Sequence, residues 1–124
     1  CAVLVWRRGT AQQLVPDGVT SATVCSMTSP EAYRIRSVAP NDLTALVRAL
    51  SAMPSPTARY AGQDPLAMCG GTGGTAPATQ VVVLSYVRGP PVAVHLFPTC
   101  ETEVSNGHRQ ATLTPQVRKL LNLG

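Results

Sequence analysis

The chain has 124 residues, the size of one domain with a single core, and we expect no second domain. Apolar residues make up 44% of it and charged residues only 13%, which excludes an intrinsically disordered chain. The net charge is +4, but the basic residues are scattered and aromatic residues make up only 4%, so we expect no nucleic-acid partner.

The cysteine content predicts two disulfides and export to an oxidising compartment, either extracellular or in the cell envelope. There is no CxxC pair and there are only 2 His residues, so we expect neither a metal site nor a cofactor. The opening run CAVLVW ends at Arg7, well short of the roughly 20 residues that span a bilayer, so we expect no transmembrane segment and no signal peptide. The cysteines are Cys1, Cys25, Cys69 and Cys100.

Cys1 has two interpretations. One disulfide from Cys1 to Cys25 and another from Cys69 to Cys100 would use every thiol and would tie the arm and a long loop to the body. A mature lipoprotein, in contrast, begins with a lipid-modified cysteine, and a lipid anchor at Cys1 would leave one thiol unpaired. We favour the paired arrangement, although four cysteines allow three pairings and the sequence does not select one.

Residues 1–18 are predicted to form an N-terminal arm or an edge strand, and residues 19–124 a single α+β domain. Residues 19–25 (VTSATVC) are short, β-branched and alternating, as in a strand. Residues 33–38 alternate too and predict a second strand with one solvated face, so that a hairpin forms. The faces of that second strand carry Tyr33, Ile35 and Ser37 on one side and Arg34, Arg36 and Val38 on the other.

From residue 41 the apolar spacing changes to that of a helix, which predicts a helix over residues 41–53 lying across the sheet. We expect Asn41 or Asp42 to cap its start and Pro54 to end it. The apolar stripe consists of Leu43, Leu46, Val47, Leu50 and Met53.

Residues 79–98 (TQVVVLSYVRGPPVAVHLFP) predict the central hairpin of an antiparallel sheet. With the turn at Gly89-Pro90, Val87 faces Val92 and Leu84 faces His95. Both faces of the hairpin are largely apolar, so we expect both to be covered, one by the helix and the other by the loop that precedes the hairpin.

The dipeptide Asn106-Gly107 predicts a second hairpin with a type I′ turn, in which Val104, Ala111 and Leu113 face inward. Thr114 followed by Pro115 then predicts the cap and first position of a short helix over residues 115–122.

The segment 54–78 is rich in Pro and Gly, shows no periodicity, and is the predicted partner-binding segment because long loops of this kind tend to be functional. Its run GGTGG (70–74) lacks the Lys-Ser/Thr of a phosphate-binding loop and is interpreted as a flexible linker. The predicted contact residues are Tyr60, Leu66, Met68, Gly70 and Thr72.

No catalytic set is visible, so we expect no enzyme. His95 lies on an apolar strand and is predicted to be a core residue, whereas His108 follows a turn and should be exposed. Carboxylates are scarce and no GxSxG motif is present. A hydrolase with a dispersed Ser-His-Asp triad is the remaining enzymatic alternative.

Two resemblances follow from the order of these motifs. VTSATVC, the leucine-rich helix, AMC, the hairpin, TC and NG resemble small exported actinobacterial domains of unknown function over residues 19–113. The strand with Cys25, the helix, Met68-Cys69, the VVV hairpin and Cys100 are similar in order to the Streptomyces subtilisin-inhibitor family, whose reactive loop follows the cysteine matching Cys69. This chain lacks that family's helix cysteine, and four glycines at 70–74 would raise the cost of ordering such a loop.

The sequence therefore predicts a disulfide-stapled α+β domain with a central hairpin, one amphipathic helix and a short C-terminal helix. Its predicted function is that of a non-enzymatic, secreted or cell-envelope binding domain whose partner is another protein or a cell-surface ligand. The alternative is a subtilisin-inhibitor-like serine-protease inhibitor that uses residues 66–75, and an assay of subtilisin inhibition separates the two.

Overall fold

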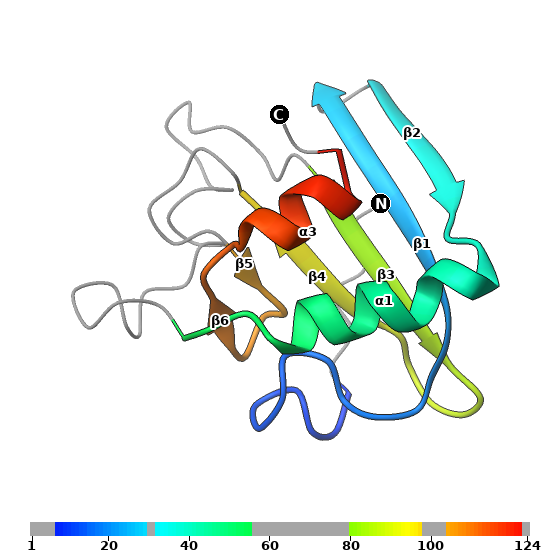
Figure 1. Ribbon diagram of the computed structural model, residues 1–124. Helices are drawn as coiled ribbons and strands as arrows, with labels where there is room; N and C mark the ends of the chain where they lie inside the picture. The colour runs from blue at the N-terminus through cyan, green and yellow to red at the C-terminus, as the bar shows by residue number, and fades with distance from the viewer. Residues whose placement is uncertain (1–6, 30–31, 56–79, 98–103, 123–124) are drawn as a thin grey trace.

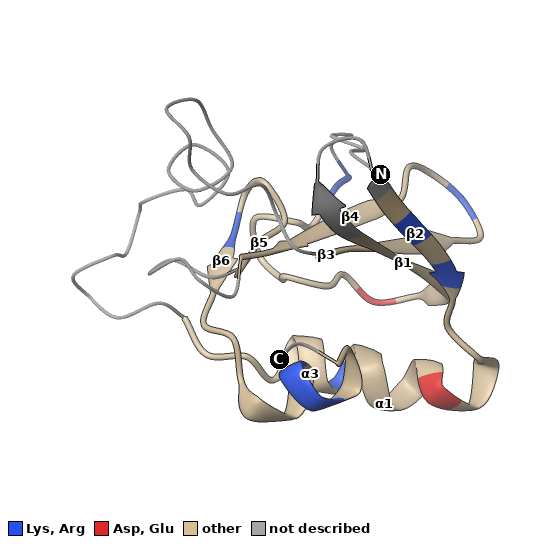
Figure 2. Ribbon diagram, turned by 90° about the horizontal axis from the view of Figure 1, so that it is seen from above, with Lys and Arg blue, Asp and Glu red and all other residues tan. Residues whose placement is uncertain are grey.

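The structure is a computed structural model that describes residues 7–29, 32–55, 80–97 and 104–122. In this part of the chain, a six-stranded antiparallel sheet of order β2-β1-β3-β4-β5-β6 has two helices packed on one face (Figures 1 and 2). The predicted α+β class with an antiparallel sheet is confirmed. The strands are β1 (Val19–Ser29), β2 (Ala32–Ser37), β3 (Gln80–Tyr86), β4 (Val92–Leu96), β5 (Val104–Ser105) and β6 (Gln110–Ala111), and the helices are α1 (Pro40–Ser51) and α3 (Pro115–Leu120).

The helix α1 confirms the predicted apolar stripe from Leu43 to Leu50 but not the predicted cap or end: α1 ends at Ser51, and Met53 is buried beyond the helix. Leu46 and Leu50 are buried, while Leu43 and Val47 are half-buried against the same core. The helix begins at Pro40, its N-cap is Ala39, and no side chain caps it. Capping by Asn41 or Asp42 was the wrong prediction. Pro40, with its helical φ and no N–H, suits the first helical position, so the cap is Ala39, two residues before Asn41.

The β3–β4 hairpin has a different register from the predicted one. Leu84 pairs with Val92 and Val82 with Val94, so Leu84 does not face His95. The connection covers residues 87–91 instead of a tight Gly-Pro turn. Pro90 and Pro91 have no N–H for the ladder, and Gly89 has a left-handed φ of 84°, so the strands separate before these residues.

The new register changes which residues share a face of the sheet. Val82 and Leu84 face the helices together with Val92, Val94 and Leu96, and these residues form the core with Leu46 and Leu50. The opposite face carries Val81, Ala93, His95 and Phe97, each at most 6% exposed. Burial of both faces is therefore confirmed. The predicted cover of this second face, segment 54–78, lies outside the described residues except at its first two positions.

The β5–β6 connection is a longer turn than the predicted type I′ turn. Val104 pairs with Ala111 and Ser105 with Gln110, which leaves residues 106–109 in the connection. Gly107 has a φ of 95°, but Asn106 is not in the left-handed region that a type I′ turn requires at both central positions. The Asn106 side chain folds the turn instead, because its Oδ1 accepts hydrogen bonds from the N–H groups of His108 (2.9 Å) and Arg109 (2.7 Å).

The last helix agrees with its predicted start. The Thr114 hydroxyl oxygen accepts a hydrogen bond from the Val117 N–H at 3.3 Å, and Pro115 takes the first helical position. The helix ends at Leu120, two residues before the predicted end. Val104, Ala111 and Leu113 are buried as predicted, together with Val117 and Leu121.

Residues 7–18 contain no strand and form an arm, whereas residues 1–6, the apolar run that could form the predicted edge strand, lie outside the described residues. Leu14 and Val15 are buried in the core, and the Asn106 Nδ2 group donates to the carbonyl oxygens of Thr10 (2.9 Å), Gln13 (3.2 Å) and Leu14 (3.0 Å). The buried Leu14 and Val15 and the Asn106 side chain of the β5–β6 turn therefore join the arm to the domain.

Arg7 and Tyr86 attach the arm at a second place. The Arg7 guanidinium lies 3.6 Å from the centre of the Tyr86 ring and donates to the carbonyl oxygens of Arg88 (2.8 Å) and Pro90 (2.9 Å). The Tyr86 hydroxyl donates to the Pro16 carbonyl at 2.7 Å. Burial raises the pKa of Tyr86 although the nearby Arg7 charge acts in the opposite direction.

Candidate functional site

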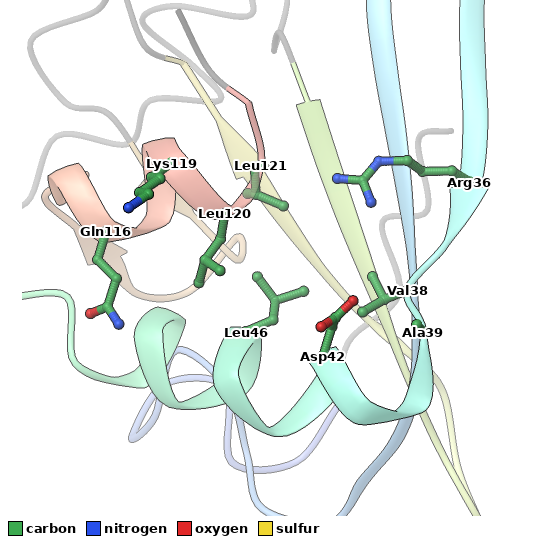
Figure 3. A pocket seen from close by; sticks show the side chains of 9 residues that line it. All are labelled: Arg36, Val38, Ala39, Asp42, Leu46, Gln116, Lys119, Leu120 and Leu121. Carbon is green, nitrogen blue, oxygen red and sulfur yellow. The ribbon is translucent and has the colours of Figure 1, made fainter.

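A pocket of about 490 Å³ lies on the helix side of the sheet, between the end of β2, the start of α1 and the helix α3 (Figure 3). Its members come from segments that are far apart in the sequence. They are Arg36, Val38, Ala39, Asp42, Leu46, Gln116, Lys119, Leu120 and Leu121.

The strand and the helices explain the positions of the three charged side chains of the pocket. Residues alternate between the two faces of β2, and Arg36 pairs with the core residue Val24, so its side chain lies on the helix side. Asp42 lies in the first turn of α1, where a carboxylate is favoured by the helix dipole, and Lys119 lies in the last turn of α3, where a cation is favoured. The helices thus place opposite charges on the two sides of the pocket.

The pocket combines an apolar wall with a charged rim. Leu46 and Leu121 are buried, and Leu120 is 39% exposed, so its side chain is accessible to a ligand. Arg36 and Lys119 are exposed cations on the rim, and Asp42 is an exposed carboxylate. With two cations against one anion, the rim favours a ligand that joins an apolar body to an anionic group.

The pocket lining contains three ionisable side chains, those of Arg36, Asp42 and Lys119. None of the nine lining residues is a Cys, His, Ser, Thr or Tyr. Asp42 is the only carboxylate among them. In the part of the chain that the structure describes, no three His, Cys, Asp or Glu side chains gather as metal ligands.

The predicted site residues on segment 54–78 lie outside the described residues, as do three of the cysteines. The partner contacts, the reactive loop of the inhibitor alternative and both disulfide pairings therefore stay predictions. These residues are Tyr60, Leu66, Met68, Gly70, Thr72, Cys1, Cys69 and Cys100. Cys25 is described: it lies on β1, is 2% exposed and is not a free thiol.

The two histidines occupy the environments that were predicted for them. His95 is buried at 5% exposure, and its ring stacks with Phe97 at a centroid distance of 6.5 Å. His108 is exposed on the β5–β6 turn, with Nδ1 3.1 Å from the Thr10 hydroxyl. Neither histidine lines the pocket.

Sequence reasoning did not find the pocket. The only feature of the sequence near the pocket residues that could have indicated it is the alternation of Arg34 and Arg36 with apolar residues. That alternation is typical of any half-solvated strand. No described helix is both long enough and apolar enough to cross a membrane. Comparison of the chain with models of protein families, with curated proteins and with solved structures finds no match.

Proposed function

We propose that this protein is a non-enzymatic binding domain, exported to the cell envelope or the cell exterior, that holds an apolar group beside an anionic group of its ligand. The pocket between β2, α1 and α3 carries this proposal. Its wall of leucines provides the apolar contact, and Arg36 and Lys119 provide the positive charge. None of its nine lining residues is a Cys, His, Ser, Thr or Tyr.

Segment 54–78 is the proposed second contact with the ligand. Described hydrogen bonds hold its first two residues and Gln80, the strand residue that follows it. At the first end, the carbonyl oxygens of Pro54 and Ser55 accept from the N–H (2.8 Å) and the hydroxyl (3.3 Å) of Thr112. At the second end, Gln80 begins β3, and its Nε2 group donates to the carbonyl oxygen of Leu121 at 3.0 Å. Because Leu121 lines the pocket, the segment joins the sheet next to the proposed site.

Two disulfides, Cys1–Cys25 and Cys69–Cys100, belong to the proposal that the protein is exported. The even number of cysteines supports them, and so does the absence of a free thiol at Cys25. Non-reducing peptide mapping by mass spectrometry of protein purified from an oxidising compartment is expected to recover these two linked pairs and no free thiol. A free thiol at Cys25, or a lipid on Cys1, would contradict this pairing.

Peptide selection tests the proposed site. A phage-displayed library of random peptides, selected on the immobilised full chain, is expected to yield peptides with an apolar residue next to a carboxylate. Lys119→Glu should weaken their binding about tenfold or more, because an attractive charge at the rim becomes repulsive. The matched control is Arg88→Glu, which changes the net charge equally at an exposed residue that does not line the pocket.

The result is read from affinities measured by isothermal titration calorimetry. If no peptide is enriched, or if Lys119→Glu and Arg88→Glu affect binding equally, the pocket is not the ligand site.

A further inference from the structure

The outer edge of the sheet at β2 has backbone groups that point away from the molecule. Among the described strands, β2 is the last of the sheet, and it pairs only with β1. The Val38 N–H donates to the Ala22 carbonyl oxygen of β1 at 2.9 Å. This bond shows which residues of β2 direct their backbone N–H and C=O groups toward β1. Because hydrogen-bonding residues alternate in an antiparallel pair, Arg34 and Arg36 direct their backbone groups toward β1. Tyr33, Ile35 and Ser37 direct theirs outward.

The side chains of β2 divide into an apolar face and a basic face. Tyr33 and Ile35 are 54% and 61% exposed, and they lie on the face away from the helices because Ile35 pairs with Cys25. Arg34 and Arg36 are also exposed, and they lie on the helix face because Arg36 pairs with the core residue Val24. Figure 2 marks the basic residues of the β2 ribbon in blue. No described carboxylate forms an ion pair with either arginine.

We propose that this edge binds an extended segment of a partner protein as an added strand, and that the segment alternates acidic and apolar residues. The outward N–H and C=O groups of Tyr33 and Ile35 would pair with its backbone. Its apolar side chains would lie beside Tyr33 and Ile35, and its acidic side chains would lie beside Arg34 and Arg36.

The charge pattern favours an acidic partner over a second copy of the chain. If two β2 edges paired in antiparallel fashion, residues 33, 35 and 37 would face one another and so would residues 34 and 36. Every well-overlapped register would then place an arginine opposite an arginine, and like charges directly opposite are destabilising. The acidic side chains of a partner strand would instead be attracted to Arg34 and Arg36. The charges of the edge therefore disfavour pairing of two copies and favour binding of an acidic partner strand.

The edge adjoins the pocket, since Arg36 belongs to both. The inference rests on the proposed function only in that the protein binds a ligand, because the edge uses the backbone of β2 and the pocket does not. Substitutions can therefore separate the two surfaces. Ile35→Pro removes one outward N–H while the bonds between β2 and β1 remain, and Ile35→Thr keeps that N–H and loses the apolar side chain.

The experiment uses two capped synthetic peptides of equal composition as probes, one with strictly alternating Glu and Val and the other with the same residues in blocks. Fluorescence anisotropy with the full chain is expected to show that the alternating peptide binds about tenfold or more tightly than the block peptide, because only the alternating peptide matches both faces of the strand. Ile35→Pro should weaken binding about tenfold, whereas Ile35→Thr should weaken it less, because the backbone bond remains.

Charge exchange provides the complementary measurement. The Arg34→Glu variant should bind the Glu/Val peptide more weakly and an alternating Lys/Val peptide more tightly than the wild type does. Circular dichroism checks that each variant is folded. Equal binding of the alternating and block peptides, wild-type binding by Ile35→Pro, or no exchange of preference in Arg34→Glu overturns the inference. A dimer that Ile35→Pro abolishes would assign the edge to a second copy and also overturn it. If Lys119→Glu abolishes peptide binding and Ile35→Pro leaves it unchanged, the proposed function of the pocket is retained and strand addition at the β2 edge is rejected.

Discussion

Replacing Asn106 with alanine is expected to lower the free energy of unfolding by about 2–4 kcal/mol, since several polar groups lose their partner together. The side chain donates to the carbonyl oxygens of Thr10, Gln13 and Leu14 and accepts from the backbone N–H groups of His108 and Arg109. An exposed asparagine without such contacts would contribute little. Here one amide folds the β5–β6 turn and attaches the arm to it.

Asn106→Asp separates these two roles. The aspartate keeps an oxygen for the N–H groups of the turn, but it places a carboxylate against the three carbonyl oxygens of the arm. Urea unfolding should therefore show a destabilised Asn106→Asp variant, and amide exchange should increase in residues 10–15. If either variant stays within about 0.5 kcal/mol of wild type, the arm is held without this side chain.

Replacing Leu50 with alanine should cost about 2–5 kcal/mol of unfolding free energy, the range for large-to-small changes in a well-packed core. Leu50 is 0% exposed and belongs to the cluster in which α1 meets Leu84 and Val94 of the sheet. The cavity left by the substitution would separate the helix from the sheet at its most enclosed point, so little relaxation is expected.

Leu43→Ala is the matched control on the same helix. Leu43 is half-buried, so the same chemical change should cost less than about 2 kcal/mol. The two values come from urea unfolding with linear extrapolation. Equal costs at the two positions would show that Leu50 is not enclosed by the sheet as the structure places it.

The parts of the fold that were predictable from sequence are those with a strong local period or a strong local cap. The spacing of Leu43, Leu46, Val47 and Leu50 predicted α1, and Thr114 with Pro115 predicted the start of α3. The register of β3 against β4 was not predictable in the same way. It depends on how many residues the Gly-Pro-Pro connection takes, and a change in that number moves every pair of the hairpin.

The candidate site was largely not predictable because its residues meet only through tertiary packing. Arg36 and Lys119 are separated by most of the chain and line one pocket only because α3 packs beside α1. The alternation in β2 predicted one solvated face, yet Tyr33 and Ile35 are exposed as well as the arginines. A period of two identifies a strand, but it does not say whether the strand lies at the edge of the sheet with its apolar face open.

Amide hydrogen exchange along β2, measured by NMR with and without the alternating Glu/Val peptide, tests the open edge most directly. In the free protein, the amides of Tyr33 and Ile35 should exchange fast, whereas those of Arg34 and Arg36 should exchange slowly because they bond to β1. With saturating peptide, exchange at Tyr33 and Ile35 should slow by about tenfold or more while Arg34 and Arg36 change little. Unchanged exchange at Tyr33 and Ile35 in the presence of bound peptide would contradict strand addition at this edge.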